Sequence, residues 1–387
     1  MKSVKIYGTG IEQEALDQFY GAMEMDFSIQ GALLPDAHPG YALPIGAVVA
    51  TKDCLVPAWV GYDQGCGVCA LRTSFDAHEV RKHAEEIFHQ VYRDVPVGFN
   101  HNHIDVPWEW ERHPHTDWLH AMFKQRGGLR QLGTLGSGNH FIEIGVGTDE
   151  HVWIVVHSGS RGIGHTMAGH YMKTASLLNT GIDKAQEGHY PLYDTTEAGV
   201  DYMIDLAFTL DYALENRKEI MTRTFHAIAR SIDPSAISHP DDYPMMINRN
   251  HNHAEYHKGL DAYIHRKGAT HAEKGMLGVI PGNMRDGSYI VRGLGNPESL
   301  YSSSHGAGRV GSRRAARESI NIEDFARQMA GIQALVSKNT LDEAPDAYKN
   351  FMEIMTLQSD LVEVVTHISP IINVKDPGGK KRKGGKP

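Results

Sequence analysis

Short apolar runs bounded by Gly, Pro or Asp recur in the first part of the chain. Residues 46–51 (GAVVAT) and 54–63 (CLVPAWVGYD) contain such runs and are rich in Val. Continuous apolar runs of this length are typical of buried strands. We therefore predict two buried strands, each ending in a loop.

Other segments space their apolar residues as a helix does. Residues 76–92 begin with Asp76, a residue type that caps helices, and predict an amphipathic helix. Residues 197–230 form the longest helix-compatible stretch, and a further helix is predicted around residues 322–337.

Two apolar stretches, 140–147 and 151–162, flank the sequence GVGTDE and predict a β-hairpin. Residues 96–118 are polar, aromatic and Pro-bearing, which indicates a long irregular loop. A last apolar strand is predicted at residues 368–375.

These patterns predict an α+β fold with central β-sheets flanked by helices. No Pro/Ser/Gly-rich linker divides the chain, so we expect one large compact domain at residues 1–375. Residues 376–387 (DPGGKKRKGGKP) are basic and of low complexity, and we expect a disordered tail. It is either a solvated tail or a contact for RNA phosphates.

Composition narrows the functional classes. Of the 387 residues, 41% are hydrophobic and 22% charged, as in soluble globular proteins. The sequence has no apolar run long enough for a membrane span and no signal peptide, and its 3 cysteines do not suggest disulfides. We expect a cytoplasmic protein without membrane contact. The net charge of −9 weakly disfavours nucleic acid, but the 24 histidines suit metal binding or acid–base chemistry.

A first motif places Asp63 and Cys66 three residues apart on a Gly-rich turn, 61–67. A carboxylate and a thiolate so placed can face one divalent metal ion. A buried structural cysteine is the alternative interpretation.

Two further motifs lie at the ends of the predicted hairpin strands. The Gly/Ser-rich loop of residues 133–144 leads into Asn139 and His140, and its backbone amides suit an anion, although a plain glycine turn would look the same. Residues 155–165 deliver His157 to a Ser/Gly loop that carries Arg161, which suits a metal ligand beside a phosphate. A core histidine is the alternative.

Two later motifs are also rich in histidine. Residues 248–257 contain His251, His253 and His257, of which two could be ligands. A His-x-His pair is often only surface, and the residues alone do not rank the three histidines. Residues 302–314 place His305 before Gly-Ala-Gly and near Arg309 and Arg313. Such a histidine suits phosphoryl or nucleotidyl transfer to an imidazole nitrogen. If residues 308–318 are helical, the two arginines share a face; a generic phosphate-binding loop is the alternative.

Together these motifs indicate a two-metal nucleotidyl- or phosphoryl-transfer site. At this level of detail they closely resemble the signature blocks of RtcB-type RNA ligases, in order, over roughly residues 30 to 375. The blocks are PDAHPGYALPIGAVVAT, VGYDQGCGV, LGTLGSGNHFIEI, HSGSRGIG, SSSHGAGRVGSR and DEAPDAYK.

The resemblance implies an RtcB-like fold with a deep metal-lined cleft. It also implies a GTP- and manganese-dependent ligase, with two Mn²⁺ per site, that joins RNA 3′-phosphate or 2′,3′-cyclic phosphate ends to 5′-hydroxyl ends. The enzyme would act in RNA repair or tRNA splicing, and a monomer is one expectation.

The resemblance also implies residue roles. His305 would be the guanylylated nucleophile and Asp36 the carboxylate that orients it. Asp63, Cys66 and His140 would bind one manganese, and Cys66, His157 and His251 the other. The residues implied for GTP are Asn139, Glu143, Asn252, Pro281, Gly282, Asn283, Met284, Ser288, Gly306, Ala307, Gly308, Tyr348 and Lys375; those for RNA phosphates are Arg161, Arg309 and Arg313.

The chain departs from the family pattern in three places. The usual Pro-Gly-Ser-Met-Gly loop reads Pro281-Gly282-Asn283-Met284-Arg285, which puts the nucleotide contacts of that loop in doubt. Tyr62 and Gln64 replace apolar residues beside the metal motif, and the chain continues beyond Lys375.

Two other functions use the same residues. A dinuclear metallophosphoesterase would need the metal ligands but has no role for a nucleotide-carrying histidine. A non-catalytic metal- or RNA-binding protein would bind without turnover. A covalent histidine adduct distinguishes the ligase from both.

Overall fold

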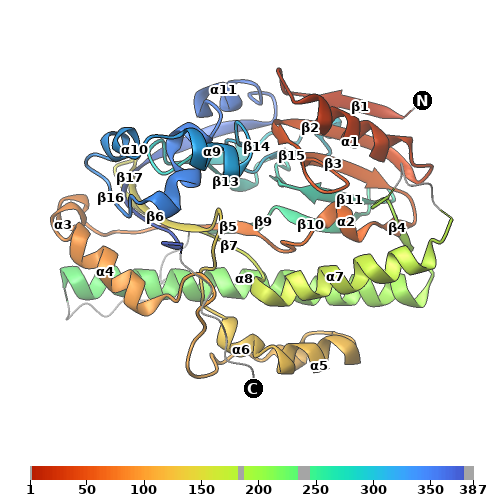
Figure 1. Ribbon diagram of the computed structural model, residues 1–387, viewed down its shortest axis with the longest axis horizontal. Helices are drawn as coiled ribbons and strands as arrows, with labels where there is room; N and C mark the ends of the chain where they lie inside the picture. The colour runs from red at the N-terminus through yellow and green to blue at the C-terminus, as the bar shows by residue number, and fades with distance from the viewer. Residues whose placement is uncertain (1, 182–186, 234–244, 379–387) are drawn as a thin grey trace.

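The computed structural model describes residues 2–181, 187–233 and 245–378. Within these residues, two sheets provide most of the framework (Figure 1). The smaller sheet has the strand order β1 (Ser3–Ile6), β2 (Ser28–His38), β3 (Ile45–Thr51), β11 (Ala262–Lys267) and β10 (Asn252–His257). The larger has the order β13 (Leu277–Pro281), β14 (Ser288–Gly293), β17 (Val362–Val374), β6 (Phe141–Gly147), β7 (Val152–Ser158), β5 (Gly67–Arg72) and β9 (Met246–Asn250).

Short strands complete the described β-structure. The strand β16 (Gln333–Ala334) runs parallel to β17, while β4 (Cys54–Leu55) pairs with β8 (Leu192–Tyr193). The strand β12 (Ala269–His271) pairs with β15 (Ser302–Ser304). The pair β12–β15 ends directly before His305, so it sets where that histidine enters the site.

Helices lie beneath the strands (Figure 1), and the longest of them packs on one face of the larger sheet. Figure 1 shows α7 (Arg161–Leu178) and α8 (Glu197–Ile232) side by side beneath the strands, with α5 (Asp117–Gln125) and α6 (Gly128–Gln131) farther out. Also on this side are α3 (Ala77–Lys82) and α4 (Ala84–Asp94). The remaining α-helices are α1 (Gln13–Glu24), α2 (Pro57–Val60), α9 (Arg313–Ser319), α10 (Ile322–Gln328) and α11 (Phe351–Thr356), and the 3₁₀ turns are η1 (Trp110–Arg112), η4 (Pro297–Ser299), η5 (Lys338–Glu343) and η6 (Pro345–Ala347).

The main core lies between the larger sheet and the helices α4 and α8. Ile142, Ile154 and Val156 of the hairpin pack there against Ile220 and Phe225 of α8. All five side chains have no solvent exposure. Because burial of each such side chain contributes about 1.5–3 kcal/mol, this interface fixes the sheet on α8.

The α+β fold, the hairpin, the long helix and the last strand predicted from the sequence are confirmed. The predicted loop at 96–118 is also confirmed, apart from η1 and the first two residues of α5. The predicted tail falls largely on residues 379–387, which lie outside the described residues, so the domain boundary and the tail's role stay predictions.

Four local predictions need correction. The predicted strand at 54–63 is β4 followed by helix α2, because Pro57 at a first helical position favours a helical turn. The predicted helix at 76–92 is interrupted at His83. The predicted helix at 322–337 ends at Gln328, and Gly331 then has a positive φ.

The fourth correction concerns Arg309 and Arg313. The helix α9 begins at Arg313, whereas Arg309 lies in the preceding loop and bridges to Tyr348. The serine before Arg313, Ser312, caps α9 by accepting a hydrogen bond from the amide of Ala315. A capping serine stops a helix from extending backwards, so the two arginines do not share a helical face.

Candidate active site

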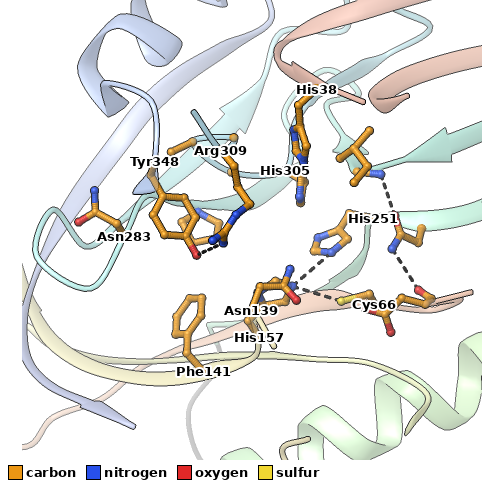
Figure 2. Close-up of a pocket in the computed structure, with 18 of the residues that line it drawn as sticks. His38, Cys66, Asn139, Phe141, His157, His251, Asn283, His305, Arg309 and Tyr348 are labelled. Atoms are coloured by element: carbon orange, nitrogen blue, oxygen red, sulfur yellow. Dashed lines mark hydrogen bonds between the residues drawn. The ribbon is translucent and has the colours of Figure 1, made fainter. Parts of the chain in front are cut away.

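A cavity of about 420 Å³ collects most of the predicted site residues (Figure 2). Strands of both sheets and the loops after them contribute to its lining. The predicted residues that line it are Asp63, Cys66, Asn139, Glu143, His157, His251, Asn252, Pro281, Gly282, Asn283, Met284, His305, Gly306, Ala307, Gly308, Arg309, Arg313, Tyr348 and Lys375. Asp36, His140 and Ser288 lie directly behind this lining, buried.

Cys66, His140 and His157 bring one sulfur and two ring nitrogens together. The Sγ atom of Cys66 lies 3.2 Å from Nε2 of His157 and 3.4 Å from Nε2 of His140. Cys66 immediately precedes β5, His140 precedes β6, and His157 lies in β7. Because β6, β7 and β5 are neighbours in one sheet, three residues far apart in sequence converge at one edge.

Asp63 and His251 extend this group on two sides. The Oδ2 atom of Asp63 lies 3.4 Å from Nε2 of His140. The Nε2 atom of His251, in the bend between β9 and β10, lies 3.3 Å from Nε2 of His157. All five residues assigned to metal ions by motif therefore adjoin one another.

The donor chemistry of this group fits divalent transition metals. The ring of His140 is oriented by a 2.9 Å hydrogen bond between Nδ1 and the carbonyl oxygen of Leu135, so Nε2 points to the cluster. Burial lowers the pKa values of His157 and His251 far below their usual range. These imidazoles are therefore neutral, the form that binds metal. Thiolate, imidazole and carboxylate donors together suit manganese or zinc.

Arg217 of α8, which no sequence motif indicated, holds the loops that carry three of these ligands. Its Nη1 donates to the carbonyl oxygens of Gly65, at 2.8 Å, and Ser158, at 3.0 Å. Its Nη2 donates to Oδ1 of Asn250 at 2.6 Å. Each acceptor is the residue next to a cluster member, and Arg217 itself is fully buried.

His305 and Asp36 form a second arrangement in the same cavity. The Nδ1 atom of His305 donates to Oδ2 of Asp36 at 2.7 Å, and the backbone amide of His305 donates to the same oxygen at 3.2 Å. Asp36 is fully buried at the end of β2. A carboxylate on Nδ1 leaves Nε2 as the nucleophilic nitrogen. The ring centroid of His305 lies 4.7 Å from that of His251.

Two glycines make room for this pair. A Cβ on Gly268 would lie 2.9 Å from Cε1 of His305, and one on Gly308 would lie 2.5 Å from the carbonyl oxygen of Asp36. Both have positive φ values, of 62° and 72°. Larger residues would therefore displace either the histidine or its carboxylate partner.

One part of the cavity lining holds buried acceptor atoms without hydrogen-bond partners. Among the described residues, Oε1 of Glu143 and Oδ1 of Asn373 accept no hydrogen bond, and the hydroxyl of Ser288 faces the carboxyl of Glu143. Burial raises the pKa of Glu143 to about 8. Unpaired buried polar atoms are costly, so these acceptors favour a ligand that brings N–H donors into the cavity. Asn373 was not identified from the sequence.

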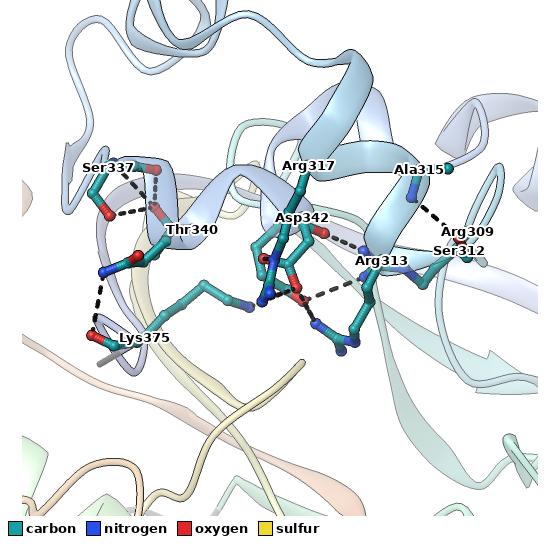
Figure 3. A network of polar contacts seen from close by, with 12 residues as sticks. Arg309, Ser312, Arg313, Ala315, Arg317, Ser337, Thr340, Asp342 and Lys375 are labelled. Atoms are coloured by element: carbon teal, nitrogen blue, oxygen red, sulfur yellow. Dashed lines mark hydrogen bonds and ion pairs between the residues drawn. The ribbon is translucent and has the colours of Figure 1, made fainter. Parts of the chain in front are cut away.

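A cationic wall adjoins these atoms and is neutralised by two acids, Asp342 and Glu343 (Figure 3). The Nζ atom of Lys375 lies 2.7 Å from Oε2 of Glu343, and the hydroxyl of Tyr348 donates to the same oxygen at 2.7 Å. Arg309 and Arg313 also pair with Glu343. Burial alone would raise the pKa of Glu343, but Lys375 and the two arginines outweigh it and lower the pKa to about 2.

These pairings bear on predicted contacts. Arg313 also pairs with Asp342 at 2.9 Å. Glu343 and Asp342 belong to a quoted sequence block, but nothing in the sequence indicated that they balance these cations. Contacts of Arg309 and Arg313 with RNA therefore stay predictions and would require rearrangement or release of these ion pairs.

Two other predicted residues use their side chains within the protein. Arg161, which does not line the cavity, donates to Oγ1 of Thr134 at 2.9 Å and to the carbonyl oxygen of Gly98 at 2.9 Å. Asn252 donates to the carbonyl oxygen of Asp63 at 3.1 Å and accepts from the amide of Gly268 at 2.7 Å. It ties the metal motif to the histidine loop.

The unusual loop at Asn283 is closed by its own side chains. The Nδ2 atom of Asn283 donates to Oδ2 of Asp286 at 2.7 Å, and its Oδ1 accepts from the amides of Arg285 and Asp286. Met284 is buried, whereas Arg285 is exposed and pairs with Asp286. The departure from the family pattern thus changes the loop's outer side and keeps the buried methionine.

None of the described helices is long and apolar enough to cross a membrane.

Comparison with known proteins identifies relatives over nearly the whole chain. Residues 18–120 and 111–376 match the family described as "tRNA-splicing ligase RtcB". An "RNA-splicing ligase RtcB" of Escherichia coli K12 is 35% identical over 390 residues, covering 95% of each chain. Two archaeal proteins named "tRNA-splicing ligase RtcB" are also similar. That of Aeropyrum pernix is 31% identical and covers 82% of each chain, and that of Nanoarchaeum equitans is 27% identical over 89% of this chain. The chain therefore belongs to the RtcB family.

Proposed function

We propose that this protein is an RNA ligase that joins a 3′-phosphate or 2′,3′-cyclic phosphate end to a 5′-hydroxyl end, using GTP and manganese. The observation that carries the proposal is the 2.7 Å hydrogen bond between His305 and Asp36, facing a cluster of metal donors in one cavity. The names of the relatives support the same activity, in RNA repair or tRNA splicing.

The first step is nucleotide transfer to His305. The Nε2 atom attacks the α-phosphorus of GTP, a nitrogen–phosphorus bond forms, and the bond to the bridging oxygen breaks as pyrophosphate leaves. Asp36 accepts the hydrogen bond from Nδ1 and stabilises the positive charge that develops on the ring. Two divalent ions held by Asp63, Cys66, His140, His157 and His251 would stabilise the charge on the phosphoryl oxygens.

The second and third steps consume this adduct. The RNA 3′-phosphate attacks the same phosphorus and releases His305, which leaves guanylate on the RNA end. The 5′-hydroxyl then attacks the RNA 3′-phosphorus, loses its proton, and GMP departs. A cyclic end is first opened by hydrolysis to a 3′-phosphate.

We assign the parts of GTP to the cavity walls by the hydrogen-bonding groups that each wall offers. Oε1 of Glu143 and Oδ1 of Asn373 are unpaired acceptors for the N–H groups of guanine. Lys375 and Tyr348 lie at the cationic wall. Ionised Glu143 accepts hydrogen bonds from guanine more strongly than neutral Glu143 does. A bound guanine would therefore favour the ionised form.

Incubation with α-labelled GTP and Mn²⁺ tests the proposal. We expect acid-labile label on the denatured protein, its loss in His305→Ala, and its retention in His257→Ala, a histidine outside the cavity lining. Addition of RNA with a 3′-phosphate and a 5′-hydroxyl should discharge the label and yield a joined strand. Phosphate release from RNA without any protein label would instead support a dinuclear phosphoesterase.

A further inference from the structure

Three exposed aromatic rings lie together beside the cavity. Tyr41 belongs to the loop between β2 and β3, Tyr62 follows α2, and His165 lies in the first turns of α7. The rings of Tyr62 and His165 are stacked, with centroids 4.9 Å apart and planes 26° apart. The ring of Tyr41 lies 6.4 Å from that of Tyr62.

These rings are open to solvent although they border a buried site. Tyr41 is 52% and Tyr62 45% exposed, and both line the cavity. Tyr62 directly precedes Asp63, whose carboxylate adjoins the metal donors. Proteins that bind single-stranded nucleic acids present exposed aromatic side chains of this kind, because every base has a face that can stack on them.

Hydrogen bonds to backbone carbonyls fix the segments that carry Tyr41 and Tyr62. The Nζ atom of Lys267 donates to the carbonyl oxygens of Tyr41 and Ala58, which joins the loop of Tyr41 to the helix before Tyr62. Gly61, between Ala58 and Tyr62, has a φ of 88°. The ring of Tyr62 lies over α7, where a Cβ on Gly169 would be 4.0 Å from its Cε1 atom. The platform is therefore preformed.

We propose that Tyr41, Tyr62 and His165 form a stacking platform for a base near the RNA end that enters the cavity. This inference rests on the proposed function, since it names how the same site holds its substrate. A base stacked on Tyr62 would place the adjoining phosphate toward Asp63 and Cys66.

Equilibrium binding tests the platform independently of catalysis. The probe is a fluorescent single-stranded RNA with a 3′-phosphate, titrated with the manganese-loaded full chain. We expect Tyr62→Ala to weaken binding about tenfold, the effect of losing one stacked base, and Tyr62→Phe to bind like the unaltered protein. Tyr20→Ala, matched in exposure at 46% but on α1, should also leave binding unchanged.

An abasic walk separates stacking from a general structural effect. Removing one base at a time from either RNA end should weaken binding to the unaltered protein about tenfold at one position. At that position the same removal should cost Tyr62→Ala nothing further. Tyr41→Ala provides a second variant if Tyr62→Ala disturbs Asp63, and manganese content reports such disturbance.

The outcomes distinguish this inference from the proposed function. Equal binding by Tyr62→Ala and the unaltered protein, or base removal that costs both the same at every position, would overturn the platform. If the unaltered protein binds RNA through the platform yet takes no label from GTP, the ligase proposal fails and the platform stands. If the protein takes label from GTP and ligates RNA, yet Tyr62→Ala and Tyr41→Ala lose no RNA binding, the platform fails and the ligase proposal stands.

Discussion

Arg217 donates a hydrogen bond from Nη1 to the carbonyl oxygen of Gly65, at 2.8 Å, from a position deep in helix α8. The same guanidinium reaches the carbonyl oxygen of Ser158 and the side chain of Asn250. These acceptors adjoin Cys66, His157 and His251, so one side chain fixes the spacing of three predicted ligands. Burial lowers the pKa of Arg217 to about 10, which leaves it charged near neutral pH.

We expect Arg217→Met to lower both stability and metal affinity. The change leaves the carbonyl oxygens of Gly65 and Ser158 without their donor, and each unsatisfied buried acceptor costs about 1–3 kcal/mol. Urea unfolding with and without Mn²⁺ would measure the free energy of unfolding and its metal-dependent part. Arg217→Lys keeps the charge but not the fork of donors, so its stability and metal affinity should lie between those of Arg217→Met and the unaltered protein. Unchanged metal affinity in Arg217→Met would contradict the positioning role.

The two neighbouring cysteines should differ sharply. Cys66→Ala removes the sulfur that lies 3.2 Å from His157, and we expect loss of bound manganese together with loss of labelling by GTP. Cys69→Ala removes a sulfur buried in the core of the larger sheet, and should lower stability by about 1 kcal/mol without loss of metal. Metal analysis of both purified variants is the measurement. Equal metal loss in both would show that Cys66 is not a ligand.

Asp36→Asn should slow nucleotide transfer while leaving the fold intact. An amide oxygen can still accept from the backbone amide of His305, but the negative charge that stabilises the imidazolium is lost. We expect single-turnover labelling of His305 to slow by roughly 100-fold or more. Manganese content and thermal unfolding serve as controls and should match those of the unaltered protein. An unaltered labelling rate would remove Asp36 from the mechanism.

Glu143 should make stability depend on pH. Burial raises its pKa from 4.5 to about 8 in the folded protein, so the folded state binds the proton more tightly than the unfolded state. The resulting stabilisation is complete below pH 4.5 and is lost as the pH rises toward 8, at about 1.4 kcal/mol per pH unit.

Glu143→Gln removes the titratable carboxyl and therefore tests this pH dependence. Denaturant unfolding of both proteins between pH 5 and 8 should show a steeper fall in stability for the unaltered protein. GTP binding should weaken in the variant, because the guanine loses a charged acceptor. Parallel stability curves would place the pKa of Glu143 in its usual range.

Local periodicity predicted much of the fold. The apolar stretches 140–147 and 151–162 around GVGTDE predicted the hairpin, and the helix-compatible stretch 197–230 predicted α8. It failed where one residue overrides a pattern: Pro57 begins a helix inside an apolar run, and Ser312 caps α9 so that Arg309 stays outside it. Such overrides depend on backbone hydrogen bonds that apolar spacing does not encode.

The candidate site was identified from motifs, but its balance of charge was not. Asp36 lies beside His305 as the family resemblance implied, and Cys66 and His305 line the same cavity. Glu343 and Asn373 gave no signal, since a single acid or amide beside a strand or a 3₁₀ turn is common. Their roles follow from neighbours such as Lys375 that only the folded chain supplies.

The amino-acid sequence by itself determined which chemistry the chain can perform, because side-chain type fixes the donors, acids and nucleophile. It also determined most of the local elements that carry these residues. Tertiary structure alone decided which of these atoms meet. Strand register brings Cys66 beside His157, the core places Arg217 behind both, and packing of α7 sets His165 under Tyr62. Contacts of this kind depend on distances across the fold, and these arise from the packing of whole sheets and helices, which no local pattern specifies.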